Sequence, residues 1–289
     1  MPEDRRLERM TAEKLYADRS ERGKLRLTGP QRAWFLHQIL TQAFEDMAPG
    51  EARDAAMITA HGRMVGFLET VATDEAILAH FEPELSSTLP DEIRRYVFAT
   101  DVQIDDVTGE MGLLLLAGDD WRDVAARVAP GGVPHETRSI GGAAGYVWIE
   151  PSRLQDSLAA LDEGGWRRAS EDELELRRID AGVPRWGRDM DSKSFPQEAG
   201  VDQWAVHYDK GCYVGQEAMA KIHFRGKVNK RLRRVSAADS LRVGSEVTID
   251  GRKVGNITSA ADHRGLALLR FDVEPGSRAL AGDVSVTVD

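Results

Sequence analysis

The pattern of apolar and polar residues predicts strands and helices in alternation over the first 180 positions. Residues 24–28 alternate with the period of a strand, and Gly29-Pro30 opens a helix that runs to about Thr41. Ser170 and Glu173 form a capping-box pattern for a helix that ends near Gly182. Further strands are predicted at 55–59, 64–70, 76–81, 102–106, 113–116 and 146–149, and further helices at 90–99, 119–128 and 152–161. This mixture permits split βαβ units and favours an α+β fold.

The texture of the sequence changes twice in the second half of the chain. Residues 183–211 show little periodicity, and a loop of this length in a compact chain is usually functional. Beyond residue 229, short β-rich segments alternate with turns such as Asp250-Gly251, which is typical of a small barrel. We therefore expect an α+β core at 24–229 and a β-barrel at 230–289. Residues 1–23 interleave acids and bases, which predicts a solvated helix or loose arm.

Composition narrows the class of protein. At roughly one domain per 150 residues, 289 residues predict about two domains, and 42% apolar with 30% charged residues is ordinary for a globular protein. The single cysteine excludes an intramolecular disulfide and a CxxC-type zinc or redox site, and it fits a reducing cytoplasm. No apolar run reaches 18 residues, and the charged N-terminal residues resemble neither a signal nor a transit peptide. We expect no membrane partner.

Charge leaves one segment open to several interpretations. The net charge of −10 argues against a general nucleic-acid binder, yet residues 221–234 hold seven Lys or Arg and no acid. This segment is a solvated edge, or a funnel for anions in which Arg225 takes part, or a phosphate-binding stretch. Nucleic acid is the least expected partner, because no nucleic-acid module surrounds the segment. No HExxH and no Cys/His cluster occur, so we predict no mononuclear metal site.

The densest polar segment is Lys210-Gly211-Cys212-Tyr213-Val214-Gly215-Gln216-Glu217. Its two glycines allow a tight turn and a close approach to a ligand. A helix is expected directly afterwards, so Cys212 would precede a helix N-terminus, whose dipole favours the thiolate, and Lys210 would add a positive charge. Two alternatives stay open: Cys212 is a buried, inert residue, or it forms a nucleophilic pair with His207 or His223.

The string KGCYVGQE resembles the signature of the YgfZ family, folate-binding proteins linked to iron–sulfur cluster assembly or repair. That family is a branch of the aminomethyltransferase superfamily, the glycine cleavage T-protein (GcvT) type. Residues 178–184 are similar to its Arg-x-(Glu/Asp)-Ala-Gly segment and residues 196–200 to its Pro-Gln-Glu segment. Order and spacing match, so the resemblance covers most of residues 24–289.

The resemblance implies both a fold and a site. The fold would be a GcvT-like core of ferredoxin-like α+β lobes around a central folate-sized channel, with a C-terminal barrel. Cys212 would be the reactive or cluster-facing thiol and Lys210 its electrostatic partner. The motif would be supported by Gly211, Tyr213, Gly215, Gln216 and Glu217. Tetrahydrofolate or a derivative would be the cofactor, with candidate contacts from Arg178, Glu198, Arg225 and Tyr146, the last of which is otherwise a core residue of its strand.

Two departures from the transferases shape the functional hypotheses. Gly66 and Phe67 stand where transferases carry an Asp-Asp pair, and Ala143 stands where a Glu pairs with the pterin ring. Gly66 and Phe67 cannot relay a proton, so we do not expect an aminomethyltransferase of the usual type, and Ala143 cannot accept the hydrogen bonds of the pterin ring. The first hypothesis is an accessory protein whose partners are iron–sulfur proteins or assembly factors. The alternatives are a tetrahydrofolate-dependent aminomethyl or methyl transferase that uses Asp180 or Glu198, and a binding module with a vestigial folate pocket.

Overall fold

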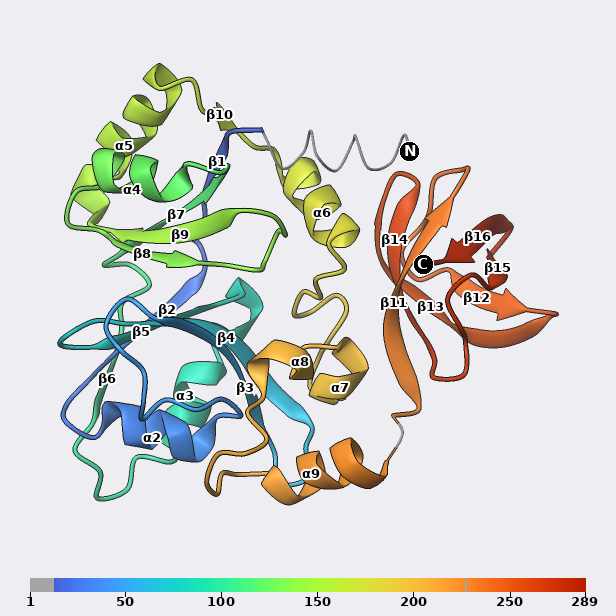
Figure 1. The fold of residues 1–289 in the computed structure, drawn as a ribbon, viewed down its shortest axis with the longest axis horizontal. Helices are drawn as coiled ribbons and strands as arrows, with labels where there is room; N and C mark the ends of the chain where they lie inside the picture. The colour runs from blue at the N-terminus through green and yellow to red at the C-terminus, as the bar shows by residue number, and fades with distance from the viewer. Residues whose placement is uncertain (1–12, 227) are drawn as a thin grey trace. The chain divides into compact units, whose positions relative to one another are not determined.

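The chain divides into two compact units in a computed structural model that describes residues 13–226 and 228–289. Unit 1 comprises Met1–Phe35, Glu45–Arg53 and Leu68–Arg177, of which residues 13 onward are described. Unit 2 comprises Leu36–Phe44, Asp54–Phe67 and Arg178–Asp289. Each unit therefore draws on segments that lie far apart in the sequence (Figure 1).

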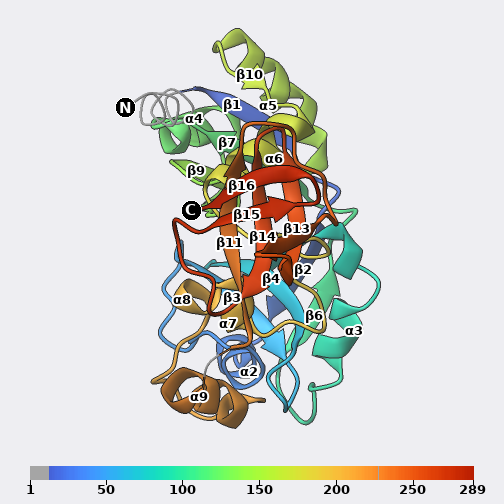
Figure 2. The ribbon, with the colours of Figure 1, turned by 90° about the vertical axis from the view of Figure 1, so that its right-hand side faces the viewer.

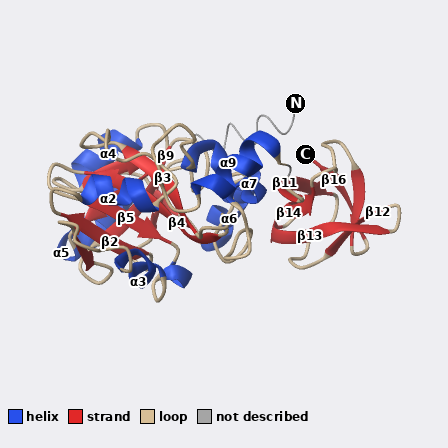
Figure 3. Ribbon diagram, turned by 90° about the horizontal axis from the view of Figure 1, so that it is seen from below, coloured by secondary structure: helices blue, strands red, loops and turns tan. Residues whose placement is uncertain are grey.

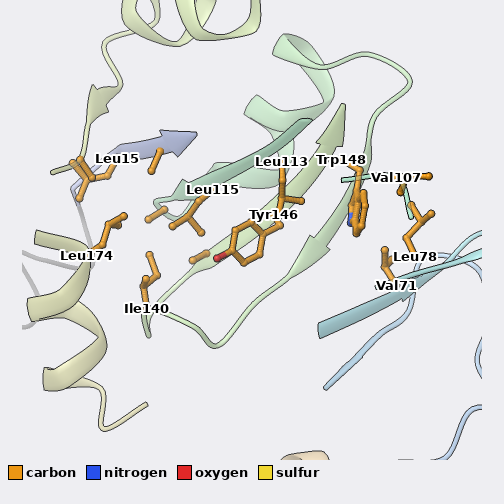
Figure 4. Close-up of a cluster of buried hydrophobic side chains, with 14 of the residues drawn as sticks. Leu15, Val71, Leu78, Val107, Leu113, Leu115, Ile140, Tyr146, Trp148 and Leu174 are labelled. Atoms are coloured by element: carbon orange, nitrogen blue, oxygen red, sulfur yellow. The ribbon is translucent and has the colours of Figure 1, made fainter. Parts of the chain in front are cut away.

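A five-stranded sheet in unit 1 has the order β10-β1-β7-β9-β8. Every side chain of β7 and β9 is buried, because both faces of the sheet are covered. The faces alternate residue by residue. Tyr146 and Trp148 enter one apolar cluster (Figure 4), whereas Val147 and Ile149 pack with residues of helices α4 and α5. The elements are β1 (Leu15–Asp18), β7 (Gly112–Ala117), α4 (Trp121–Val128), β8 (Val133–Glu136), β9 (Ala144–Ile149), α5 (Pro151–Glu163) and β10 (Arg167–Arg168).

Strand β1 corrects one expectation from the charge pattern. Residues 15–18 were expected in a solvated arm, but they form a buried strand that pairs antiparallel with β7. Leu15 and Ala17 pack into one apolar cluster and Tyr16 into the other. Three consecutive apolar residues are enough for an inner strand, and the charges on either side hid them. Arg19 and Arg22 of the predicted arm are buried as well, and Gly23 begins β2 (Gly23–Thr28). Residues 1–12 of the arm lie outside the described residues.

A second five-stranded sheet has the order β3-β4-β5-β2-β6, and the division between the units passes along β3 and β4. Gly23 opens β2 because a Cβ there would come within 2.0 Å of the Phe81 ring on β5. The elements are β2 (Gly23–Thr28), α2 (Arg32–Ile39), β3 (Ala52–Ile58), β4 (Met64–Ala72), β5 (Ile77–Phe81), the 3₁₀ helix η1 (Pro83–Leu85), α3 (Leu89–Arg94), β6 (Gln103–Asp106) and α6 (Glu171–Asp180).

Unit 2 ends in a closed barrel with the strand order β11-β14-β13-β12-β15-β16 (Figures 2 and 3). Closure leaves no open sheet edge, and Val247, Ile257 and Leu269 are among the residues that fill its interior. Asp250 and Gly251 both have positive φ, as the predicted two-residue turn requires. The elements are α7 (Pro196–Ala199), α8 (Asp202–Ala205), α9 (Gln216–Arg225), β11 (Lys230–Ala237), β12 (Glu246–Ile249), β13 (Arg252–Ala261), β14 (Arg264–Arg270), β15 (Arg278–Ala281) and β16 (Val284–Val288).

Candidate functional site

The Cys212 loop, residues 206–215 of unit 2, connects α8 to α9. Its last turn depends on Gly215, which has φ +83° and precedes the first residue of α9. A Cβ at this position would lie 2.4 Å from the carbonyl oxygen of Thr59, so a side chain would meet main chain at a strained φ. The amide of Val214 donates to the carbonyl of Gln38 at 3.2 Å. Main-chain contacts therefore hold the loop on both sides of the turn.

Lys210 anchors the start of the motif. Its ammonium group is buried and donates to the carbonyl oxygens of His37, of Leu40 at 2.5 Å and of Gln42 at 2.8 Å. These carbonyls lie at and just beyond the end of α2, where helix carbonyls lack partners within the helix and a cation is favoured. Lys210 Nζ also lies 4.4 Å from the centre of the Tyr213 ring. The lysine thus joins the motif to a helix end, and its action on the thiol stays a prediction.

Cys212 is exposed, so the alternative of a buried and inert cysteine does not hold. Tyr213, the next residue, is buried, and burial raises the pKa of its hydroxyl to about 12. The loop therefore turns one side chain inward and leaves the preceding sulfur accessible. Helix α9 begins four residues after Cys212, with the turn at Gly215 between them. A partner molecule can reach the sulfur without any opening of the fold.

The two polar residues that end the motif belong to the first turn of α9. Gln216 is half-buried and is the first residue of the helix. Glu217 is exposed and pairs with Lys221 at 2.6 Å, and the hydrogen bond from this lysine lowers the pKa of the carboxyl. An exposed pair one turn apart stabilises a helix only slightly. Glu217 is thus accessible from solvent, and its support of the motif stays a prediction.

His37 is the histidine that the fold brings to the motif. Its Nδ1 accepts from the amide of Phe44 at 3.3 Å, and its Nε2 lies 3.9 Å from where a Cβ on Gly211 would stand. His207 and His223 flank the motif in sequence, and both are exposed. The ring of His223 stacks on that of Tyr208, a residue of the Cys212 loop, with 3.7 Å between the ring centres. Sequence could not single out His37, because more than 170 positions separate it from Cys212.

Arg178 was a candidate folate contact, and in the structure its guanidinium forms hydrogen bonds with other residues of unit 2. Nη1 donates to Asp189 Oδ2 at 2.6 Å and to the carbonyl of Val183 at 2.7 Å, and Nη2 donates to Ser259 Oγ at 2.7 Å. Asp189 also accepts from Thr258 and Ser259 of β13. Loss of either partner of such a buried ion pair would leave an uncompensated charge, so both segments are needed to stabilise it. The arginine joins the end of α6 to the barrel, and a folate contact stays a prediction.

The other three candidate contacts lie in separate surroundings. Glu198 Oε2 accepts from the amide of Phe195 at 3.0 Å and faces Arg63 at 3.4 Å, so it caps α7. Tyr146 lies in the core of unit 1, where burial raises the pKa of its hydroxyl. Arg225 ends α9, and its side chain lies outside the part of the chain that the structure describes.

Comparisons with known proteins bear on the identity of this fold. The family model described as the CAF17 C-terminal beta-barrel domain matches residues 229–289. The crystal structure of glycine cleavage system aminomethyltransferase T from Bartonella henselae aligns with 98% of this chain and 87% of that chain, with a TM-score of 0.85 at 15% identity. The GcvT-like α+β fold with a C-terminal barrel is confirmed.

Two curated relatives extend the comparison. The chloroplastic protein At1g60990 of Arabidopsis thaliana is 27% identical over 85% of this chain, and the chain spans 61% of its length. The human mitochondrial iron–sulfur cluster assembly factor IBA57 is 32% identical over 44% of this chain and 40% of its own length. The resemblance to the YgfZ family within the aminomethyltransferase superfamily is confirmed. The chain is thus similar both to an aminomethyltransferase and to an assembly factor.

The positions at which this chain departs from the transferases lie on two strands. Gly66 and Phe67 lie in β4, and Ala143 directly precedes β9. A carboxylate that sequence reasoning missed does occur on β4: Glu69 is buried and bonds to Arg22 at 3.2 Å and to Thr137. Its polar partners come from distant parts of unit 1, so no local motif announces it.

The described residues form neither a metal site nor a membrane-spanning helix. No cluster of three or more His, Cys, Asp or Glu side chains stands ready to hold a metal ion in residues 13–226 and 228–289. In the same residues, no helix has the length and apolar character needed to cross a membrane.

Proposed function

We propose that this chain is an accessory protein in iron–sulfur cluster assembly or repair, and that Cys212 is its reactive or cluster-facing thiol. The observation that carries the proposal is the exposed sulfur on a loop held by Lys210 and Gly215. The printed name of a human relative, an iron–sulfur cluster assembly factor, supports the pathway. Iron–sulfur proteins or assembly factors would be its partners.

The number of thiols limits how Cys212 can act. Iron–sulfur clusters are usually held by four protein ligands, and this chain has one cysteine. A thiolate on an exposed, anchored loop can occupy one coordination position while a partner protein supplies the others. The chain would then contact a partner's cluster transiently and would not hold a cluster by itself. Anchoring the loop beforehand lowers the entropy lost in such an encounter.

The decisive experiment compares variants in cells that lack the native protein. Cys212→Ala is expected to lose most of the iron–sulfur enzyme activity that the wild-type chain restores, and Cys212→Ser is expected to behave like it, since a hydroxyl is a poor cluster ligand. Asp209→Asn, an exposed residue of the same loop that lies outside the motif, is the matched control and is expected to restore activity. Full restoration by Cys212→Ala, at equal protein level, would remove the thiol from the mechanism.

For the small-molecule ligand we propose tetrahydrofolate or a derivative. The GcvT-like fold supports this, because an aminomethyltransferase shares it. The departures at Gly66, Phe67 and Ala143 argue for binding without transferase turnover. Calorimetry with tetrahydrofolate and its polyglutamates tests the proposal: a dissociation constant below about 10 μM, or −7 kcal/mol, supports a working pocket. No heat at higher concentrations would leave a vestigial one.

We also propose a cytoplasmic location, because a single cysteine is typical of a reducing compartment. The relatives named above are chloroplastic and mitochondrial, so the compartment needs its own test. Fractionation of the source cells, with the chain detected by antibody, is expected to place it with cytoplasmic markers. Recovery with an organelle would contradict this location and leave the role of Cys212 unchanged.

A further inference from the structure

A second polar cluster lies in unit 1 and is independent of Cys212. The Arg22 cluster consists of Arg22, Glu69 of β4, His80 of β5 and His135 of β8, and all four side chains are at least 94% buried. Arg22 Nη2 bonds to Glu69 Oε1 at 3.2 Å, and Nη1 bonds to the carboxylate of Glu82. The cluster thus encloses one cation, one carboxylate and two imidazoles, with the carboxylate of Glu82 at its edge. None of these groups has a part in the proposed function.

The hydrogen bonds fix where the protons sit on both histidines. Arg22 Nε always carries a proton and donates to His80 Nδ1 at 2.9 Å, so this nitrogen is bare. The proton of neutral His80 must then lie on Nε2, which faces His135 Nε2 at 3.0 Å. His135 Nε2 accepts the hydrogen bond from His80 Nε2–H, so it carries no proton of its own. The remaining proton of His135 therefore lies on Nδ1.

His135 Nδ1 is left as a buried donor without a protein partner. The atom is solvent-inaccessible and makes no hydrogen bond within the described residues, and the residue is 1% exposed. An unsatisfied buried donor costs about 1–3 kcal/mol, so such groups in native proteins usually meet an ordered molecule. Trp148 Nε1, on the neighbouring strand β9, is a second buried donor without a partner, and its ring contacts that of His80.

We propose that unit 1 binds a neutral oxygen acceptor, a water molecule or the oxygen of a small ligand, at the Nδ1–H of His135. The proton on Nδ1 excludes a metal ion there, since a metal needs the bare nitrogen. The neutral state is supported by burial, which lowers the pKa of His135 to about 3 with further help from Arg22. A guest that also reaches Trp148 Nε1–H would accept two hydrogen bonds, as a water or carbonyl oxygen can.

The proton assignment is tested first, by ¹⁵N NMR of the full chain labelled in its histidine rings. Bare and protonated ring nitrogens have well-separated shifts. We expect one pair of histidines whose shifts do not change between pH 5 and 8, with His135 protonated at Nδ1 and His80 at Nε2. Loss of one member in His135→Phe assigns the pair. A bare Nδ1 on His135 would overturn the proposal, because no donor would then be free.

The guest is tested by a crystal structure of the full chain at a resolution that shows waters. We expect density within about 3 Å of His135 Nδ1. An isolated peak, with a native mass equal to that of the chain, identifies water; extended density with added mass identifies a ligand. The peak is expected to vanish in crystals of His135→Phe, which keeps a ring but no nitrogen. An empty position, a protein acceptor at Nδ1, or a peak unchanged in His135→Phe would overturn the proposal.

Discussion

The Cys212 loop and the Arg22 cluster differ in how they expose their polar groups to solvent. The loop leaves a cysteine exposed, and its buried cation, Lys210, donates to main-chain carbonyls that hold the loop in place. The cluster buries its cation, Arg22, against two carboxylates and fixes the protons of two histidines around it. The first arrangement makes one side chain available to partners, whereas the second keeps every charged group away from water. Reactivity is expected from the loop and rigidity from the cluster.

Removing the cation of the cluster is expected to have the largest effect on stability. Arg22→Met removes the cation that pairs with the buried carboxylate of Glu69 and with Glu82, and breaking a buried ion pair in this way costs about 3–5 kcal/mol in the free energy of unfolding. Arg26→Met is the matched control, because Arg26 is well exposed and faces Asp105 at 3.4 Å, so its loss should cost less than about 1 kcal/mol. Urea unfolding measures both. Equal losses would mean that the cluster contributes no more than a surface pair.

The pH dependence of stability is the next property expected to distinguish the Arg22 cluster from the Cys212 loop. Burial lowers the pKa of His80 and His135 below the usual value of 6.5, that of His135 to about 3. Between pH 3 and 6.5 the unfolded chain binds more protons, so this stability is present above pH 6.5 and is lost as the pH falls. Each such histidine contributes a slope of up to about 1.4 kcal/mol per pH unit.

The measurement compares the pH slope of the unfolding free energy between wild type and His135→Phe. The contribution of Glu69, whose pKa is raised by burial, is present in both proteins and cancels in the comparison. We expect a shallower slope in the variant between pH 5 and 6.5. The same slope in both would show that His135 is not held neutral.

Sequence predicted one of these regions and could not predict the other, for a physical reason. The Cys212 loop is contiguous, so its two glycines and its thiol appear as a motif, and the strand at Tyr146 appears from its apolar, β-branched neighbours. The Arg22 cluster comes from four separate strands and their flanks, and each member alone resembles a surface residue. Only the sheet register, with Glu69 opposite His80 and His135 opposite Tyr146, brings these side chains to one place.

The same reason explains why the partners of Arg178 could not be predicted. The family resemblance made Arg178 a candidate ligand contact, which stays a prediction, but no motif indicated that its guanidinium bonds to Asp189 and to Ser259 of the barrel. The partner Asp189 lies in the aperiodic stretch 183–211, where no pattern predicts burial. Charge pairing across such distances depends on the tertiary fold.

Removing Lys210, which anchors the Cys212 loop, is expected to lower the free energy of unfolding less than removing Arg22 from the cluster. Lys210→Met removes a cation from three carbonyls at the end of α2, which should lower the free energy of unfolding by about 2–3 kcal/mol. Lys221→Met is the control, since Lys221 is exposed and pairs only with Glu217 in its helix turn. Cys212 should react faster with iodoacetamide in Lys210→Met, as the loop loosens. Unchanged stability and rate would show that Lys210 does not hold the loop.

The turn at Gly215 separates two costs, and the difference in stability between two glycine variants is the smallest effect expected. Gly215 and Gly244 have nearly the same φ, +83° and +85°, but a Cβ at Gly215 would meet the Thr59 carbonyl at 2.4 Å whereas nothing lies within 4 Å of one at Gly244. Both Ala variants therefore pay the left-handed backbone penalty of about 1–2 kcal/mol. Gly215→Ala should lose about 1–2 kcal/mol more, because the loop must shift away from Thr59. Equal losses in urea unfolding would mean that the loop moves freely at this turn, and the sulfur of Cys212 would then not be held in one place.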